Sequence, residues 1–267
     1  MKIGFFYQAG HMDNNLLSTY MALKQLRRIY QDNPVAFFED ESDNLKDIAL
    51  EFNCDYTKIP SEDNTFHKRM PVVDLKTGLQ WLERIYNSCE TSLKDCEWIM
   101  HFEDDVWLQK PIEKYPVLDF AGTIGHGHPL PLYEYFKNRF NINDDSRDYR
   151  SPLGQLTAYG MCGGSIFKKD AFLNAYLKIN EIDWEYISSL DFRICRYSDA
   201  ILSFVLNNAG YRYEVWSEWT QYQVGDKTEC PVLHNVKHFY DYKSVENLPE
   251  VLAKTEVDDF LKFHNGL

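Results

Sequence analysis

Long apolar runs are missing from this sequence. No stretch approaches the ~18 consecutive apolar residues that a helix needs to span a bilayer. The first ten residues, MKIGFFYQAG, are too short and turn polar too early for a signal peptide. We interpret them as a first strand that begins at once, and we expect a soluble protein in a cytosol-like compartment, without leader or anchor.

Cysteine and positive charge are also in short supply. The six cysteines stand far apart and form no CxxC pair, which argues against a disulfide framework or a thiolate zinc site and favours reduced thiols. Lys and Arg total 28 against 41 Asp and Glu, so the formal net charge is −13. A surface this acidic argues against nucleic acid or anionic membrane as a partner bound through bulk electrostatics.

Internal repeats, low-complexity tracts and credible linkers are absent as well. What is present is ample core material, because 44% of the 267 residues are hydrophobic and 15% are aromatic. This composition suits one large domain as well as two, and because the chain has no credible linker we expect a single domain over residues 1–267.

The first half of the chain alternates short apolar runs with amphipathic stretches. The expected strands are residues 3–7, 34–40, 54–60 and 97–108, and the expected helices are residues 14–30, 42–53 and 73–89. We expect Ser42 or Asp43 to cap the second helix. This alternation predicts βαβ units and a mostly parallel sheet, with ligands bound at the carboxyl ends of the strands.

The second half is less regular. Residues 123–155 are rich in proline, glycine and charge, so we expect a long functional loop with one helix near residues 132–140. A Gly-rich turn, a strand and a helix capped near Asp170 follow. A further helix is expected to start near Asp199 and to stop at Gly210, before a strand over residues 211–216.

The segment HFEDDVWL places three acids, Glu103 to Asp105, inside the most strand-like part of the chain. Carboxylates at the end of a buried strand repel one another and resist burial, unless a cation lies among them. Their hard oxygens suit Mg²⁺ or Mn²⁺. Because residues two apart on a strand share a side, Glu103 and Asp105 should converge while Asp104 points away. The alternative is a solvated acidic turn, which the apolar residues on both sides disfavour.

The order of these segments resembles that of glycosyltransferases of the GT-A fold. EDD at 103–105 resembles their Asp-x-Asp motif, with Glu in place of its first Asp. The segments VAFFEDESDNL, YGMCGGSIFKKDAF, YSDAILSFVLNNAGYRY and VLHNVKHFY resemble the later parts of that fold in the same order. The resemblance runs from Ile3 to about Tyr240.

This resemblance implies an α/β, Rossmann-like fold with a mixed, mostly parallel central sheet flanked by helices and an irregular acceptor-side half. Residues 1–110 would form the nucleotide-binding half and residues 111–267 the acceptor-binding half. It also implies transfer of a sugar from a nucleotide-sugar, for which we expect a UDP-sugar, to a glycan or other hydroxyl acceptor. A system of this kind without an anchor suggests a bacterial or viral source.

Chemistry and resemblance together give the candidate site residues. The diphosphate leaving group needs its growing charge neutralised, so a metal held by Glu103, Asp105 and His234 is expected. Contacts to the nucleotide-sugar are expected from Gln8, Gly10, Asp40, Lys68, Arg69, Asp104, Gly163, Gly164 and Lys237. The two glycines would let the backbone approach the sugar closely, or they simply form a tight turn.

An inverting transfer also needs a general base on the acceptor hydroxyl. Asp199, at the expected start of a helix, is the first candidate, and Asp191 is the reserve. The alternative for Asp199 is an ordinary helix cap.

Two other functions share parts of this pattern. A nucleotidyltransferase that makes nucleotide sugars has the same kind of sheet and carboxylates, but YQAGHMDNN lacks its Gly-rich, basic phosphate loop. A non-catalytic carbohydrate-binding protein would not need the acids and His234 all in place. The sequence names neither the sugar nor the acceptor, and it leaves the oligomeric state open.

Overall fold

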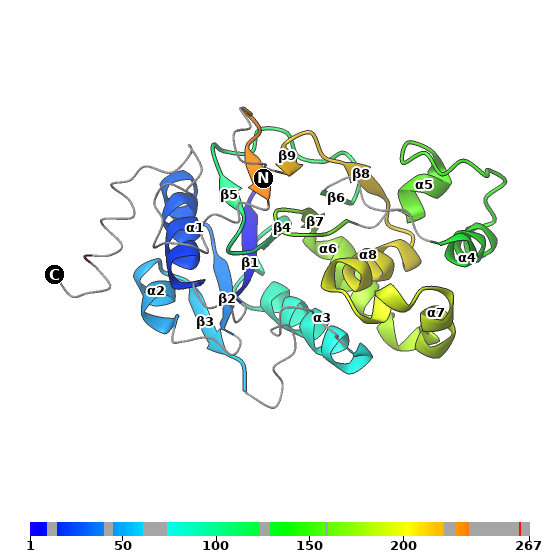
Figure 1. The fold of residues 1–267 in the computed structure, drawn as a ribbon, viewed down its shortest axis with the longest axis horizontal. Helices are drawn as coiled ribbons and strands as arrows, with labels where there is room; N and C mark the ends of the chain where they lie inside the picture. The colour runs from blue at the N-terminus through cyan, green and yellow to red at the C-terminus, as the bar shows by residue number, and fades with distance from the viewer. Residues whose placement is uncertain are drawn as a thin grey trace.

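A seven-stranded sheet forms the centre of the computed structural model (Figure 1). The structure describes residues 1–9, 15–39, 45–60, 74–122, 129–157, 160–221, 228–234 and 262. In strand order β3-β2-β1-β4-β7-β6-β8, the sheet comprises β3 (Asp55–Lys58), β2 (Val35–Glu39), β1 (Ile3–Ala9), β4 (Trp98–Phe102), β7 (Ile166–Lys168), β6 (Phe120–Gly122) and β8 (Tyr213–Val215).

Most strand pairs in this sheet are parallel. β1 pairs in parallel with β2 and β4, β2 with β3, and β6 with β8. Only β7 runs antiparallel to both of its neighbours, β4 and β6. The mixed, mostly parallel sheet that the sequence predicts is therefore confirmed.

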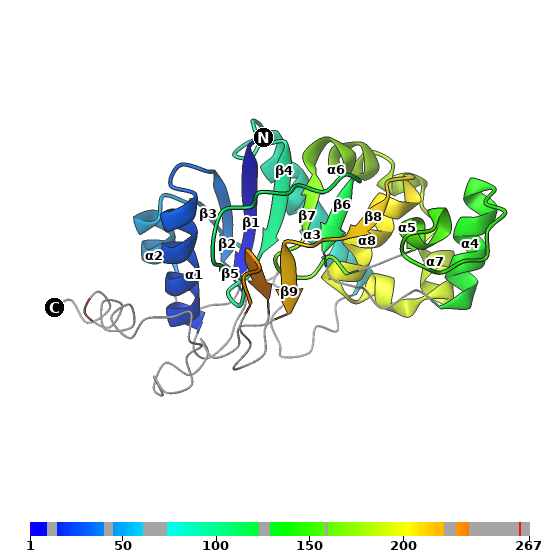
Figure 2. The ribbon, with the colours of Figure 1, turned by 90° about the horizontal axis from the view of Figure 1, so that it is seen from above.

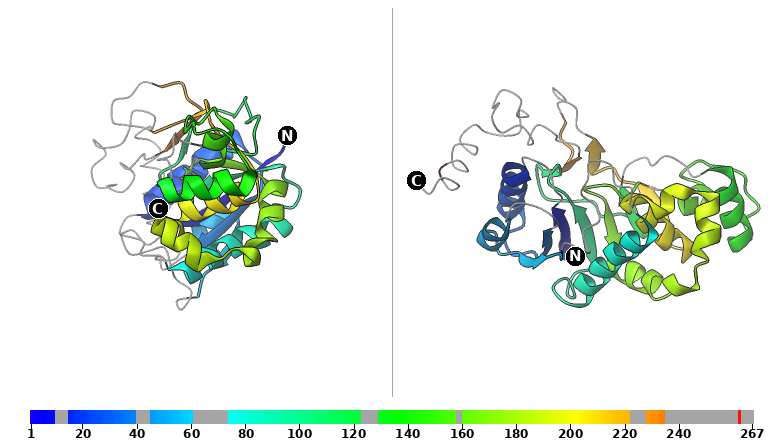
Figure 3. Two further views of the ribbon diagram at one scale, coloured as in Figure 1. Left: turned by 90° about the vertical axis from the view of Figure 1, so that its right-hand side faces the viewer. Right: turned by 60° about the horizontal axis from the view of Figure 1, so that its bottom comes forward.

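Helices cover both faces of the sheet. They are α1 (Asn15–Ile29), α2 (Lys46–Glu51), α3 (Leu75–Glu90), α4 (Leu130–Phe140), α5 (Pro152–Thr157), α6 (Lys169–Tyr176), α7 (Trp184–Leu190) and α8 (Ser198–Asn208), with short 3₁₀ helices η2 (Ile179–Glu181) and η3 (Phe192–Cys195). The helices α4, α5 and α7 gather at one end of the molecule, away from α1 and α2 (Figure 1). Figure 3 (left) looks directly onto that end.

Each central strand contributes to two cores because successive side chains point to opposite faces. Phe5 and Tyr7 of β1 pack with residues of α1 and α2, whereas Phe6 between them packs with Trp81 of α3. All four side chains are fully or almost fully buried. Because both faces are buried, the strand sequences are continuous apolar runs and do not alternate between apolar and polar residues.

The apolar run after the three acids belongs to a second, smaller sheet. β5 (Trp107–Leu108) pairs antiparallel with β10 (Val232–His234), which pairs in parallel with β9 (Trp219–Gln221). Figure 2 shows β5 and β9 near the carboxyl end of β1. The expected strand over residues 97–108 is thus two strands in two sheets, and the acids form the corner between them.

The helix caps differ from those predicted. α2 begins at Lys46 and is preceded by Leu45, which offers no side-chain cap, while Ser42 and Asp43 lie outside the described residues. The buried carboxylate of Glu39 replaces the cap, because its Oε2 accepts a hydrogen bond from the Leu45 amide at 2.7 Å. A residue of the preceding strand therefore holds the start of this helix.

The second half contains more helix than the sequence predicts. α4 matches the one helix expected within residues 123–155, but α5 and α7 were not predicted because short helices give little periodic signal. α6 starts after Lys168, without a side-chain cap, and Asp170 lies in its first turn. The predicted stop of α8 is confirmed by Gly210, whose φ of +93° an L side chain rarely adopts.

All six cysteines lie in the described part of the chain and are free thiols. Among the helices that the structure describes, none is both long enough and apolar enough to cross a membrane.

Candidate active site

The three acids form a tight turn at the carboxyl end of β4. The Val106 amide donates to the Glu103 carbonyl at 3.1 Å, which closes the turn and sends the chain into β5. Asp104 points away from the other two acids, and its Oδ2 accepts a hydrogen bond from the Ser18 hydroxyl of α1 at 3.2 Å. Glu103 and Asp105 converge as expected, but the cause is this turn and not the alternation of a strand.

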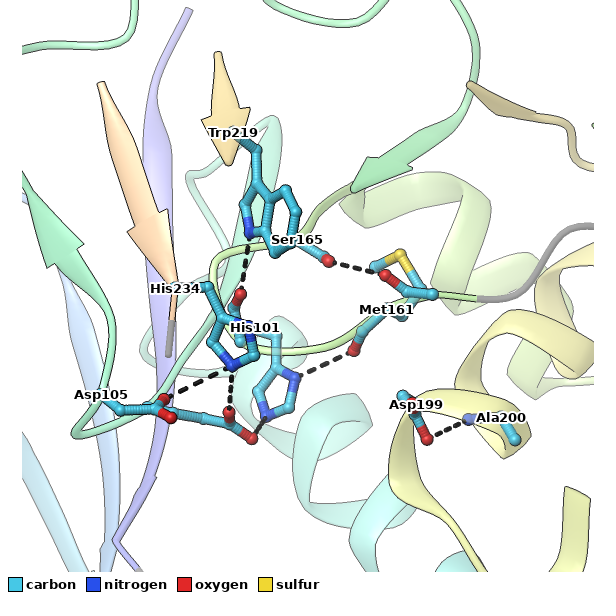
Figure 4. Close-up of polar contacts among 11 residues, drawn as sticks. His101, Asp105, Met161, Ser165, Asp199, Ala200, Trp219 and His234 are labelled. Carbon is cyan, nitrogen blue, oxygen red and sulfur yellow. Dashed lines mark hydrogen bonds and ion pairs between the residues drawn. The ribbon is translucent and has the colours of Figure 1, made fainter. Parts of the chain in front are cut away.

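β10 brings His234 to the same point. Its Nε2 lies 3.6 Å from Glu103 Oε2 and 3.5 Å from Asp105 Oδ1 (Figure 4). One ligand atom from each of these three residues lies within 4.8 Å of the others. The pairing of β10 with β5 explains the convergence, because β5 begins two residues after Asp105.

This cluster has the composition of a divalent-cation site. Two carboxylates and one imidazole form a donor set that suits Mn²⁺, and the carboxylates also suit Mg²⁺. Asp105 is buried, and Glu103 and His234 are only partly exposed, so the donor atoms are held in place by the surrounding chain. The residues present therefore fit a bound metal, and their role as ligands remains a prediction.

Gly163 lies directly against the cluster. A Cβ atom at this position would lie 2.4 Å from Glu103 Oε2 and 2.9 Å from His234 Cδ2, so any other residue would push the Glu103 carboxylate out of its present position. Gly164 adopts φ of +83°, and a Cβ there would meet Val232 and Trp219 of the small sheet. The expected close approach of the backbone is thus made to Glu103 and Trp219, and donor contact by either glycine stays a prediction.

His101, the penultimate residue of β4, orients the carboxylate of Glu103. Its Nε2 lies 3.3 Å from Glu103 Oε1, on the other oxygen from the one facing His234. Its Nδ1 lies 3.2 Å from the Met161 carbonyl oxygen, which fixes the ring (Figure 4). Because a carbonyl only accepts, Nδ1 is the donor in this contact. His101 is 3% exposed and packs edge-on against Trp81, with ring centroids 5.3 Å apart.

Sequence reasoning missed the role of His101. The residue opens the quoted segment HFEDDVWL, and its position two residues before Glu103 is the only signal that the sequence offers. Side chains two apart at a strand end share a side. That rule would have placed the imidazole next to the carboxylate.

The charges in the cluster are strongly coupled. Burial favours the neutral form of Glu103, but the charge of His101 and a hydrogen bond from His234 overcome it and lower the pKa of Glu103 to about 2. Burial likewise opposes the imidazolium of His234, yet hydrogen bonds with Cys162 and Glu103 and the charge of Asp105 raise the His234 pKa well above its usual value. Without a metal, the imidazolium therefore neutralises the carboxylates.

Asp199 lies across from the cluster at the start of α8 (Figure 4). Its Oδ1 accepts a hydrogen bond from the Ala200 amide at 2.8 Å. Burial raises the pKa of Asp199, and the negative charge of Glu103 raises it further. A carboxylate with a raised pKa is a better proton acceptor than a fully solvated one. Asp199 does not cap α8, because the capping position is occupied by Tyr197, which makes no side-chain cap bond.

Asp191, the reserve candidate, has a structural role in this geometry. Its carboxylate accepts hydrogen bonds from the Arg193 guanidinium, the closest from Nη2 at 2.8 Å, and its Oδ1 accepts from the Arg193 amide at the start of η3. The residue is 4% exposed. A carboxylate paired with a guanidinium accepts a proton less readily, which favours Asp199 over Asp191 as the base.

The remaining predicted contacts are only partly visible. Gln8 is half-buried near the end of β1, and its contact with a nucleotide stays a prediction. Gly10, Asp40, Lys68, Arg69 and Lys237 lie outside the described residues. Glu39, which precedes Asp40, has structural contacts. Its carboxylate accepts hydrogen bonds from the Leu45 amide and from the Tyr56 hydroxyl at 2.9 Å, and it forms an ion pair with Lys58.

Comparison with known proteins gives only distant structural likenesses. No protein-family model matches the chain, and no curated protein matches it. The chain is similar to the galactosyltransferase LgtC in complex with donor and acceptor sugar analogues, at 12% identity and a TM-score of 0.48, over 98% of this chain and 96% of that one. Mouse xyloside xylosyltransferase 1 in its apo form is similar at 11% identity and a TM-score of 0.46, over 90% and 99%.

Core-mannan synthase A from Aspergillus fumigatus, in an Mn/GDP form, is similar at 13% identity and a TM-score of 0.41, over 80% of this chain and 73% of that one. These structures are of the kind that the sequence resembles. Identities and TM-scores at this level transfer no activity to this chain.

Gly163→Ala should weaken Mn²⁺ binding about 10–100-fold, because the new methyl group displaces a carboxylate that the metal needs. The affinity would be measured by electron paramagnetic resonance of free Mn²⁺. Gly210→Ala is the matched control, since its Cβ would lie no closer than 3.5 Å to Phe140 and far from the acids in the fold. It should lose about 1 kcal/mol of unfolding free energy from its positive φ and keep the wild-type affinity. Unchanged binding in Gly163→Ala would show that Glu103 is no ligand.

Metal binding should release about one proton near neutral pH, because His234 is protonated in the metal-free site and binds a metal only as the neutral imidazole. The Mn²⁺ affinity should therefore rise with increasing pH until the pH passes the raised pKa of His234. Calorimetry in two buffers of different ionisation enthalpy measures the release. His234→Gln should bind more weakly and release no proton. Equal proton release by that variant would contradict the assignment.

Proposed function

We propose that this protein is a metal-dependent glycosyltransferase, which moves a sugar from a nucleotide-sugar, in our expectation a UDP-sugar, to a hydroxyl group of a carbohydrate acceptor. The observation that supports it most strongly is the convergence of Glu103, Asp105 and His234, with the carboxylate of Asp199 across from them (Figure 4). Metal ligands and a separate base are the two elements that an inverting transfer requires.

The ligand cluster would meet the diphosphate of the donor. Glu103, Asp105 and His234 would hold Mn²⁺ or Mg²⁺, which acts as a Lewis acid on the leaving diphosphate. His101 would keep the Glu103 carboxylate oriented through Nε2, while its Nδ1 remains anchored on Met161. Gly163 would leave room for that carboxylate. The cluster lies at the carboxyl end of β4, where open α/β sheets bind their ligands.

Asp199 would act on the acceptor. Its carboxylate takes the proton of the attacking hydroxyl, whose oxygen forms a bond to the anomeric carbon. The bond from that carbon to the diphosphate oxygen breaks, and the nucleoside diphosphate leaves with the electron pair. The raised pKa of Asp199 favours uptake of the proton, and the amide of Ala200 holds one carboxylate oxygen in position.

Both halves of the chain contribute to this site. Glu103 and Asp105 belong to residues 1–110, whereas Asp199 and His234 belong to residues 111–267. We propose a single catalytic domain, in which the first half binds the nucleotide and the second half binds the acceptor and completes the metal site.

Nucleotide binding should depend on both the metal and Asp105. Calorimetric titration of the wild type with UDP and GDP should give binding of one nucleotide in the presence of Mn²⁺ and a loss of at least about tenfold without it. Asp105→Ala should bind neither. The control, Asp95→Ala, changes an exposed acid before the start of β4 and should behave as wild type. Failure of the wild type to bind any nucleotide would overturn the proposal.

Release of pyrophosphate from UTP and a sugar 1-phosphate would instead identify a nucleotidyltransferase.

Asp199→Asn should slow sugar transfer by about 10²–10⁴-fold, because the amide cannot accept the proton. Its Mn²⁺-dependent nucleotide affinity should stay within about twofold of wild type, since Asp199 lies outside the ligand cluster. Asp170→Asn, the same change in the first turn of α6, should leave both properties unchanged. Full activity in Asp199→Asn would indicate another base or a retaining reaction. The measurement is release of nucleoside diphosphate from radiolabelled donor.

A further inference from the structure

A groove of about 520 Å³ lies between the start of α3, the helix α7 and η3. Residues from all three elements line it, among them Leu75, Trp184, Glu185, Ser188, Phe192 and Arg196. Its volume is in the range of small-molecule sites. It is separate from the ligand cluster, because none of the three ligand residues lines it.

Aromatic rings form the apolar part of this groove. Phe192 is 55% exposed although it lies in the ordered helix η3, and the Arg196 guanidinium lies over its ring at 5.2 Å from the centroid. Trp184 is half-buried and packs against Phe204, with ring centroids 5.9 Å apart, so its ring is held in place. Leu75, Trp184 and Phe192 together give the groove a contiguous apolar wall, and such a wall in a groove is typical of a ligand-binding surface.

The polar part of the groove suits an uncharged ligand rich in hydroxyl groups. Ser188 and Ser189 offer hydroxyls, and the charged residues are of both signs, with Asp74 and Glu185 against Arg196. A phosphate or an acidic peptide would meet two carboxylates, and a cation would meet Arg196. A sugar ring fits both parts, since its C–H face packs on an aromatic ring and its hydroxyls hydrogen-bond to the polar groups.

The groove adjoins the proposed base along the chain and in space. Arg196 ends η3, and Asp199 follows it by three residues at the start of α8. η3 packs against both α8 and α7, and α3 also packs against α8. Figure 4 shows Asp199 across from the ligand cluster, at the start of the helix α8 on which the groove-lining elements pack. An extended ligand in the groove would therefore present one end to Asp199.

We propose that this groove is the acceptor subsite, and that it binds a neutral oligosaccharide by stacking sugar rings on Phe192 and Trp184. The terminal hydroxyl of that oligosaccharide reaches Asp199, which takes its proton as the oxygen bonds to the anomeric carbon and the nucleoside diphosphate leaves. The assignment rests on the proposed transferase function and names its acceptor as a neutral glycan, not a protein side chain or a phosphorylated sugar.

Saturation-transfer NMR and acceptor kinetics with lactose, maltotriose, cellotriose and chitotriose test the proposal. The wild type should bind at least one of these probes, and Phe192→Ala should weaken that binding at least about tenfold, with Phe192→Trp restoring it. The KM for the same probe should rise with little change in kcat. Ser188→Trp, which fills the groove, should abolish transfer to the probe. Tyr186→Ala is the matched control, because this 50% exposed aromatic residue of α7 does not line the groove.

Equal probe binding by Phe192→Ala and wild type would overturn the groove as a glycan site, and so would the absence of any probe binding by the wild type. A change in sedimentation of Phe192→Ala, without a change in probe binding, would assign the groove to contact between copies of the chain. Hydrolysis of the donor by water, measured without acceptor, separates the two proposals. Hydrolysis of the donor without Phe192-dependent probe binding would refute only the groove as acceptor subsite. Probe binding without any nucleotide binding would refute the transferase function and leave a carbohydrate-binding protein.

Discussion

Repulsion between two carboxylates at the end of a buried strand is the constraint on which the rest of this site depends. Glu103 and Asp105 are brought to the same side of a turn, where each negative charge opposes the ionisation of the other unless positive charge compensates it. His234 supplies that charge to both acids at 3.5 and 3.6 Å, and His101 faces the second oxygen of Glu103 at 3.3 Å. Because a protonated His234 compensates the two carboxylates, a divalent cation bound by the same three residues can replace that positive charge.

The architecture around the turn serves to bring these opposite charges together. β4 lies at the centre of the large sheet and is buried along its whole length, so the position of the turn is fixed. β5 leaves the turn and pairs with β10, which carries His234. Gly163 lets the neighbouring chain lie directly on the Glu103 carboxylate, and its carbonyl accepts from Trp219 of the small sheet at 3.0 Å. The small sheet therefore closes the cluster by holding His234 against Glu103 and Asp105.

The proposed reaction divides its work between two sides of this cluster. The ligand residues would neutralise the leaving group, and Asp199 would take the proton of the acceptor, in a position where burial and the charge of Glu103 raise its pKa. In the proposal, the acceptor occupies the groove with Phe192 and Trp184, which none of the ligand residues lines, and the donor meets the ligand cluster. Direct displacement at an anomeric carbon requires the acceptor hydroxyl and the leaving diphosphate to lie on opposite sides of that carbon.

The sequence by itself determined the mostly parallel sheet, the position of the three acids directly after the buried strand β4 and a helix that begins near Asp199, because each follows from the spacing of neighbouring residues. Tertiary structure alone decided that β5 leaves the large sheet, that His101 contacts Glu103, that Gly163 lies directly against a carboxylate, and that Asp191 pairs with Arg193. The physical reason is distance along the chain. The anchor of His101 on Met161 joins residues 60 positions apart, and no local pattern reports such a contact.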